Sequence, residues 1–296
     1  MFCSMEEMCQ SSNQNGRNLY ETILQDDVEE RGTTKEESLA KMNELWQVMK
    51  KTAADYDGNL KSASGLSGGD AQKYQEYTQT KEALIGSFVS SVMYYALCTA
   101  ESNACMRRIV ASPTAGSCGV IPAVLIPYQK RFGVSDGKIV EGLYVAAGIG
   151  QVIAQRASIA GAEGGCQAEI GTASAMAAGM LVYLQGGRKE QVLHAVSMAL
   201  KNILGLVCDP VAGLVEVPCI KRNVMGAVNA VTSADMALAG IASRIPCDEV
   251  IDAMKRVGHA MPEALRETSK GGLADTPTAR KISEMLKGKN YCFAVI

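Results

Sequence analysis

The chain has 296 residues, of which 47% are hydrophobic and 20% are charged, and its formal net charge is -2. This length suffices for one large or two ordinary globular domains, and the near-zero charge excludes a polybasic nucleic-acid-binding protein and an acidic solvating tail. Aromatic residues make up only 5%, so a stacking platform for bases or sugars is not expected.

The first part of the chain predicts two helices after a polar start. Residues 1–17 are polar and are expected to form a loose segment, and a helical pattern begins at Leu19. The pair Thr33–Thr34 precedes the pair Glu36–Glu37 at the spacing of a capping box, which predicts a second helix start. Behind it, apolar residues at steps of three and four predict an amphipathic stripe with a core-packing tryptophan: Leu39, Met42, Trp46, Met49 and Ala53.

The rest of the chain alternates between apolar stretches of helical length and compact loops. The Gly/Ser-rich segment 64–69 predicts a loop, and the pattern is helical again from Lys81 to Arg108. The apolar runs 170–184 and 224–242 favour buried core helices, because the first is short for a bilayer and the second contains charged and polar residues. Since strand signals are scarce, we expect an all-α, mostly helical protein. Residues 18–285 would form a single compact multi-helix domain, followed by a tail over 286–296.

Cellular context follows from the N-terminus and the cysteines. The first residues include Glu6 and Glu7 and contain no apolar signal core, so a cytoplasmic protein without membrane contact is expected. Its ten cysteines should then be reduced, and the absence of a Cys-x-x-Cys pair argues against a zinc ribbon or a redox dithiol. A free cysteine is often a small buried hydrophobic residue, which is the expectation for most of them.

Gly- and Pro-rich loops between the helices carry the candidate chemistry. The four loops are SPTAGSCG (112–119), GAEGGCQ (161–167), CDPVAGLVEVPC (208–219) and KGGLADTPT (270–278). Cys166, Cys208 and Cys219 lie in two of them. Cys219 follows a proline at a predicted helix start, where a helix dipole lowers a thiol pKa. The three thiolates could converge on one soft metal centre, but their spacing alone leaves buried hydrophobic roles open.

The loop 112–119 offers a candidate anion site. Its small residues place several backbone N–H groups near one surface, and Pro122 suits the first turn of a following helix. Such a segment can hold a carboxylate, or it can be a tight turn that needs small residues for steric reasons. SGLSGGDA (64–71) is a similar case, with Asp70 as a possible hydrogen-bond anchor.

Other polar residues have open roles. His194 and His259 could act as bases, but neither lies beside a Gly-rich loop, so structural roles are favoured. Lys221 and Arg222 directly follow Cys219 and could bind an anion or line a solvated helix start. Motifs of nucleotide binding, zinc proteases and serine hydrolases are absent, as is the lysine pattern of pyridoxal phosphate enzymes.

Taken together, the motifs over roughly residues 20–285 resemble the α chain of bacterial iron–sulfur-dependent L-serine dehydratase (L-serine ammonia-lyase). The matching segments are SGLSGGDA, SPTAGSCGVIPAVL, GLYVAAGIGQVIAQRASIAGAEGGCQAEIGTASAMAAGML, GLVCDPVAGLVEVPCIKRN and ALRETSKGGLADTPT. The resemblance implies a 4Fe–4S cluster held by Cys166, Cys208 and Cys219, with the fourth iron open for L-serine. Cys118 shares a motif loop, and Cys292 lies too far from the chain's end for a clear cluster-capping role.

The resemblance also implies a reaction and a partner. A Lewis-acidic iron would stabilise the departing hydroxide of L-serine, and loop groups would orient the substrate carboxylate: Ser112, Thr114, Gly116, Ser117 and Lys221. Single-chain relatives carry a second domain with a Ser-Ser-His-Thr-type motif that is thought to supply the base, and this chain has none. A separate β chain is therefore expected. Cysteine desulfidase of the related family and a non-catalytic iron–sulfur subunit remain alternatives.

Overall fold

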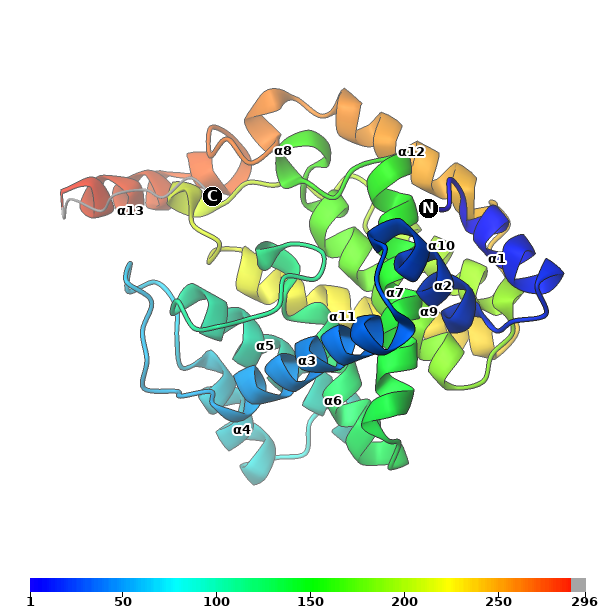
Figure 1. The fold of residues 1–296 in the computed structure, drawn as a ribbon. Helices are drawn as coiled ribbons and strands as arrows, with labels where there is room; N and C mark the ends of the chain where they lie inside the picture. The colour runs from blue at the N-terminus through cyan, green and yellow to red at the C-terminus, as the bar shows by residue number, and fades with distance from the viewer. Residues whose placement is uncertain (289–296) are drawn as a thin grey trace.

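The computed structural model describes residues 1–288, which form thirteen α-helices and no β-strand (Figure 1). The helices are α1 (Met5–Gln14), α2 (Leu19–Arg31), α3 (Lys35–Ala54), α4 (Asp70–Thr80), α5 (Gly86–Ala104), α6 (Val120–Phe132), α7 (Asp136–Arg156), α8 (Gly161–Gly164), α9 (Thr172–Leu184), α10 (Lys189–Lys201), α11 (Cys219–Leu238), α12 (Cys247–Ala260) and α13 (Pro277–Lys287). Short 3₁₀ or π turns join them: η1 (Ala115–Ser117), η2 (Gln167–Gly171), η3 (Val211–Gly213), η4 (Glu263–Leu265) and η5 (Gly272–Asp275). The predicted all-α class and single compact domain are confirmed.

Helix α9 forms the centre of the core. It packs against α7, α10 and α11, and nearly all of its residues are buried. A Cβ atom on Gly179 would lie 2.4 Å from Ile149 Cδ1 and 3.0 Å from Val196 Cγ2, so α7 and α10 approach α9 too closely for any side chain there. The prediction of a buried helix over 170–184 is confirmed, although its first two residues belong to the π-helical turn η2. None of the helices within residues 1–288 is both long and apolar enough to cross a bilayer.

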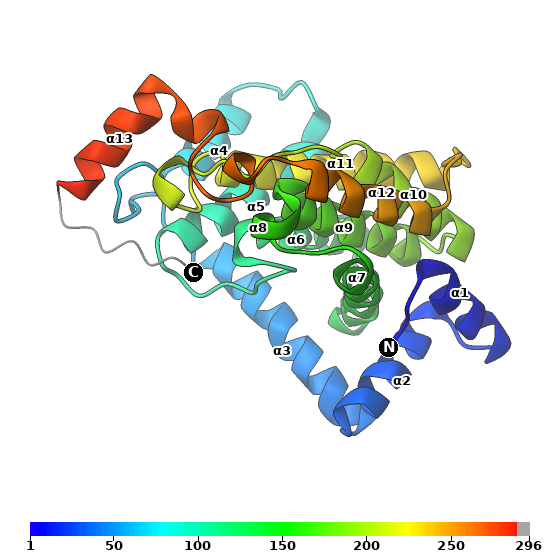
Figure 2. The same ribbon diagram turned by 90° about the horizontal axis from the view of Figure 1, so that it is seen from above.

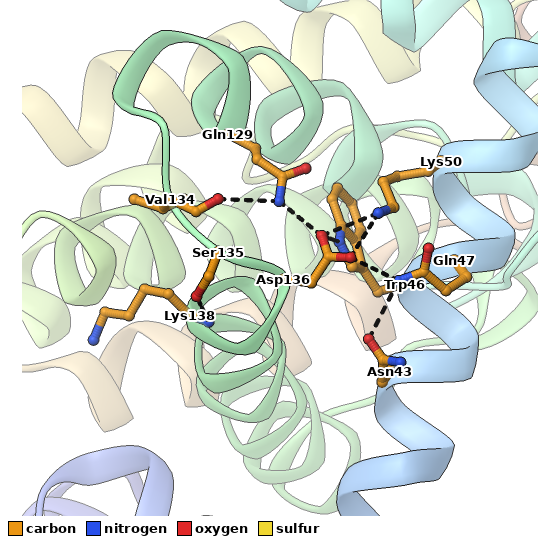
Figure 3. A network of polar contacts seen from close by, with 9 residues as sticks. All are labelled: Asn43, Trp46, Gln47, Lys50, Gln129, Val134, Ser135, Asp136 and Lys138. Atoms are coloured by element: carbon orange, nitrogen blue, oxygen red, sulfur yellow. Dashed lines mark hydrogen bonds and ion pairs between the residues drawn. The ribbon is translucent and has the colours of Figure 1, made fainter.

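A buried tryptophan and a charged network fix α3 against the start of α7 (Figure 3). Trp46 is fully buried, as its place in the amphipathic stripe predicts. Its indole N–H donates to Asp136 at 2.8 Å, and Lys50 and Gln129 donate to the same carboxylate at 2.8 Å each. The bonds from Lys50 and Gln129, followed by those from Gln47 and Trp46, hold the pKa of Asp136 far below its usual range.

The N-terminal segment 1–17, which was predicted to be loose, instead contains helix α1. Met5 and Met8 are fully buried, and α1 packs against α2 and α12. The Ser4 side chain caps the helix, and the Met5 amide donates to Asp248 on α12 at 2.9 Å. The loose-segment prediction is therefore wrong, because the apolar face of a short helix outweighs the polar composition around it.

The next helices follow the sequence pattern more closely. Thr34 and Glu37 form a reciprocal capping box at the start of α3, which confirms the predicted helix start. The predicted helix over 81–108 begins later than expected, because Lys81 is extended and Leu84 is fully exposed in the loop before α5.

The two ends of the described chain lie far apart. Helices α1 and α13 occupy opposite ends of the molecule (Figures 1 and 2), and α13 contacts η3 and η5. Because α13 continues to Lys287, the boundary proposed between domain and tail falls inside a helix. Cys292 lies outside the described residues.

Candidate metal centre

Three cysteines that are far apart in the sequence face one region of the protein. Cys166 lies between α8 and η2, Cys208 lies in the loop after α10, and Cys219 is the first residue of α11. Cys166 and Cys208 are buried and Cys219 is partly buried. Burial is the main cause of the raised pKa of Cys208 and of Cys219, and smaller contributions come from the charges of Cys166 and Cys219 at Cys208 and of Cys166 at Cys219. These mutual effects indicate that the three thiols lie in the same region.

Burial dominates the acidity of these thiols. It raises the pKa of Cys166 to about 12, with a further contribution from the charge of Glu169. Burial also raises the pKa of Cys208 and of Cys219, although Cys219 begins a helix. The predicted lowering of the Cys219 pKa at the helix start is thus wrong, because the loss of hydration outweighs the helix dipole. Thiols of this kind need a positive partner to become thiolates.

Two carboxylates that the sequence analysis missed lie beside Cys208. One ligand atom from each of Glu169, Cys208 and Glu267 lies within 4.8 Å of the others, and the Cys208 thiol donates to Glu169 Oε2 at 3.7 Å. A Cβ on Gly161 would lie 2.9 Å from Glu169 Oε2 and 3.0 Å from both Cys208 Sγ and Glu267 Oε2. Glycine at 161 therefore leaves the space in which these three groups meet. Burial raises the pKa of both carboxyl groups.

Arg222 supplies the buried positive charge of this region. Its side chain is only 14% exposed and forms an ion pair with Asp209 at 2.8 Å. It also donates to the carbonyl of Val207 at 2.7 Å and contacts the Cys166 thiol. The guanidinium thus connects the start of α11 to the Cys208 loop and to Cys166. Arg222 therefore does not line a solvated helix start; it stabilises the contact between these segments.

A C-terminal segment, residues 263–275, encloses the Cys208 loop. The Cys208 amide donates to the carbonyl of Leu265 at 2.9 Å, and the Glu267 amide donates to the Cys208 carbonyl at 2.7 Å. The Leu273 amide donates to Asp209 Oδ2 at 2.8 Å. These bonds join residues that are more than fifty positions apart in the sequence. They hold Glu267 beside Cys208.

The loop 112–119 meets the cysteine region through Glu169. The Thr114 hydroxyl donates to Glu169 Oε1 at 2.7 Å, and a Cβ on Gly116 would lie 3.0 Å from the same oxygen. Ser117 is fully buried and bonds to the Thr114 hydroxyl at 3.1 Å. Ser112 is also buried, and its hydroxyl has no hydrogen-bond partner among residues 1–288. These four predicted site residues belong to one loop, which Glu169 connects to Cys208.

Lys221 differs from the other predicted substrate-binding residues. Its side chain is 61% exposed and pairs with Asp70 at 2.5 Å. Asp70 begins α4 and acts as the anchor that the SGLSGGDA motif suggested. The preceding loop is held by the buried carboxylate of Glu216, which accepts hydrogen bonds from Ser62 at 2.7 Å and Ser64 at 2.9 Å. The SGLSGGDA loop is thereby fixed to the loop between Cys208 and Cys219.

The remaining candidates do not join this group. His194 lies on α10 and His259 on α12, and no hydrogen bond or ion pair within residues 1–288 links either one to the three cysteines. Cys118 is fully buried, and burial raises its pKa to about 12. Cys98 is buried in a separate apolar cluster with Ala71 and Ile220, as expected for a cysteine that acts as a small hydrophobic residue.

Comparison with known proteins confirms the resemblance seen in the motifs. The family model described as "Serine dehydratase alpha chain" matches residues 14–274. A Bacillus subtilis (strain 168) protein named "Probable L-serine dehydratase, alpha chain" is 46% identical over 288 residues, 97% of this chain and 96% of the relative. "L-serine dehydratase, alpha chain" of Peptoniphilus asaccharolyticus is 44% identical, covering 95% and 97% respectively. "L-serine dehydratase TdcG" of Escherichia coli (strain K12) is 37% identical over 92% of this chain and 61% of the relative. This chain therefore belongs to the serine dehydratase alpha chain family.

Proposed function

We propose that this chain is the cluster-binding subunit of an L-serine dehydratase that deaminates L-serine to pyruvate and ammonia. Full-length similarity to proteins named as L-serine dehydratase alpha chains supports this activity. The observation that carries the proposal is that Glu169, three residues after Cys166, contacts both the Cys208 thiol at 3.7 Å and Thr114 of loop 112–119 at 2.7 Å.

The donor set fits a 4Fe–4S cluster bound by Cys166, Cys208 and Cys219. Thiolates are the ligands that iron–sulfur clusters use, and the three thiols come from loops rather than from one short metal-binding motif. Because burial raises the pKa of Cys166, its thiol would lose its proton only when a metal cation takes the proton's place. When bound, a cluster with three protein ligands supplies a Lewis-acidic iron to stabilise the departing hydroxide of L-serine.

The chain's own residues would bind and orient the substrate. The buried hydroxyl of Ser112 has no hydrogen-bond partner within residues 1–288, and Gly116 leaves room for Glu169, since a Cβ there would lie 3.0 Å from Oε1. A substrate carboxylate placed there would accept hydrogen bonds from loop groups that are already held in position. Lys221 would bind the substrate only after its ion pair with Asp70 breaks. Of the predicted substrate-binding residues, it should therefore contribute least to binding.

The proposed reaction removes the α-proton and the β-hydroxyl of L-serine as water. The resulting aminoacrylate tautomerises to an imine, and hydrolysis of the imine gives pyruvate and ammonia. We assign the base for the α-proton to a separate β chain, with which this chain would form a heterodimer or a higher oligomer. An oxygen-sensitive cluster needs reducing surroundings, so the proposal implies a cytoplasmic enzyme.

The direct test is anaerobic iron–sulfur reconstitution of the full chain, followed by turnover assays with L-serine and with L-cysteine. The proposal predicts a cluster spectrum that L-serine alters, and pyruvate formation that is slow until the β chain is added. Preferred release of sulfide from L-cysteine would instead indicate a cysteine desulfidase. A cluster that does not respond to either amino acid would indicate a non-catalytic iron–sulfur subunit.

A further inference from the structure

Two carboxylates lie beside Cys208, and neither forms an ion pair with any residue of 1–288. Glu169 and Glu267 belong to the group whose ligand atoms lie within 4.8 Å of one another. None of the ion pairs formed within residues 1–288 includes either residue. The charge of Arg222 acts on Glu169, but its ion pair is with Asp209 at 2.8 Å. Two like-charged groups at this distance repel each other unless a positive group joins them.

The two oxygens of Glu169 are in different situations. Oε1 accepts a hydrogen bond from the Thr114 hydroxyl at 2.7 Å, which turns the carboxylate toward loop 112–119. Oε2 accepts only the weak bond from the Cys208 thiol at 3.7 Å. Within residues 1–288 no other hydrogen bond to Oε2 is formed, so this oxygen can accept a stronger donor.

The substrate of the proposed reaction carries the missing group. L-serine has an α-ammonium with three N–H donors, and a carboxylate is its strongest common partner in proteins. A second observation also points to a ligand at this place. The Ser117 hydroxyl bonds both the Ser112 carbonyl and the Thr114 hydroxyl, which ties Ser112 to the loop that holds Glu169. The buried Ser112 hydroxyl has no partner within residues 1–288 and is a donor for the substrate carboxylate.

We propose that Glu169, assisted by Glu267, binds the α-ammonium of the substrate and thereby selects amino acids against the corresponding hydroxy acids. This inference rests on the proposed function and goes beyond it, because it assigns recognition of one substrate group to two named side chains. Thr114 is a positioning residue in this arrangement, since it acts by holding the Glu169 carboxylate.

The test compares L-serine with L-glycerate, in which a hydroxyl replaces the ammonium. The cluster-loaded full chain is titrated with each compound anaerobically, and dissociation constants are taken from the change in the cluster spectrum. We expect Glu169→Gln to weaken L-serine binding by about 10- to 100-fold, the range for loss of a hydrogen bond between charged groups, and to leave L-glycerate binding unchanged. Glu267→Gln should cause a smaller loss in the same direction.

A matched control is Glu163→Gln, which changes an exposed carboxylate of α8 in the same sequence motif. It should bind both compounds as the unmodified chain does. The proposal is overturned if Glu169→Gln binds L-serine normally, or if it weakens both compounds equally. It is also overturned if Glu169→Gln and Glu267→Gln both fail to load a cluster, because the carboxylates would then organise the metal centre. If the unmodified chain loads a cluster that ignores L-serine, the proposed function itself fails.

Discussion

Replacing Gly161 by alanine tests whether the close packing around Cys208 contributes to the stability of the chain and to its iron uptake. The added Cβ would lie 2.9 Å from Glu169 Oε2, 3.0 Å from Cys208 Sγ and 3.0 Å from Glu267 Oε2. All three atoms are ends of side chains, so they can move aside. The expected cost is therefore about 1–2 kcal/mol, at the low end for overpacking of a buried site. The displaced atoms include one proposed metal ligand, so iron uptake should fall as well.

The assay is thermal unfolding of the metal-free chain, followed by measurement of bound iron after anaerobic reconstitution. For a domain of this size, the expected loss lowers the melting temperature by about 2–4 °C. Gly137→Ala is the control, because its Cβ would meet only Ser135 Oγ at 3.8 Å, and alanine in a helix should be neutral or stabilising. If Gly161→Ala melts like the control and takes up iron fully, the packing argument is wrong.

Two further changes test the anchors of the site and of the fold. Asp136→Asn should lower the free energy of unfolding by about 1–2 kcal/mol near neutral pH through loss of charged hydrogen bonds. Asp55→Asn, at the exposed residue that ends α3, should cost less than about 0.5 kcal/mol, and urea unfolding measures both. Because the folded pKa of Asp136 is lowered, its contribution is present above about pH 4 and is lost as the pH falls below that value. Equal loss in both variants at pH 7 would contradict this. Arg222→Lys should loosen the Cys208 loop and destabilise the chain by about 3 kcal/mol, since lysine cannot reach Asp209 and a carbonyl together. Arg280→Lys, at an exposed pair, should change neither the melting temperature nor the protease sensitivity of residues 263–275.

The sequence predicts local structure well where the signal is local. The capping box at Thr34 and the stripe through Trp46 both give α3 as observed. Helix α1 was missed because its signal is short, although Met5, Met8 and Cys9 stand at helical spacing and are all buried. The apolar face of α1 is buried by α2 and α12. The residues next to α1 in the sequence do not predict these contacts.

At the site, too, residues in recognisable motifs could be predicted, whereas contacts between distant segments could not. Family motifs pointed to the three cysteines and to loop 112–119, and the structure brings these segments together. Neither spacing nor composition points to Glu267, because it is far from Cys208 in the sequence. Backbone hydrogen bonds of the C-terminal segment hold it beside Cys208 in the fold. Glu169 stands three residues after Cys166 and could have been suspected. The helix-dipole argument for a lowered pKa at Cys219 failed because burial is a tertiary property.

The central claim is that Cys166, Cys208 and Cys219 together hold one iron–sulfur cluster. The most direct measurement is the iron and sulfide content of the reconstituted full chain after each of these cysteines is replaced by alanine in turn. The account predicts that each replacement abolishes cluster uptake, whereas Cys98→Ala, at a fully buried position, retains it. Normal iron and sulfide content in any one of the three variants would contradict the account.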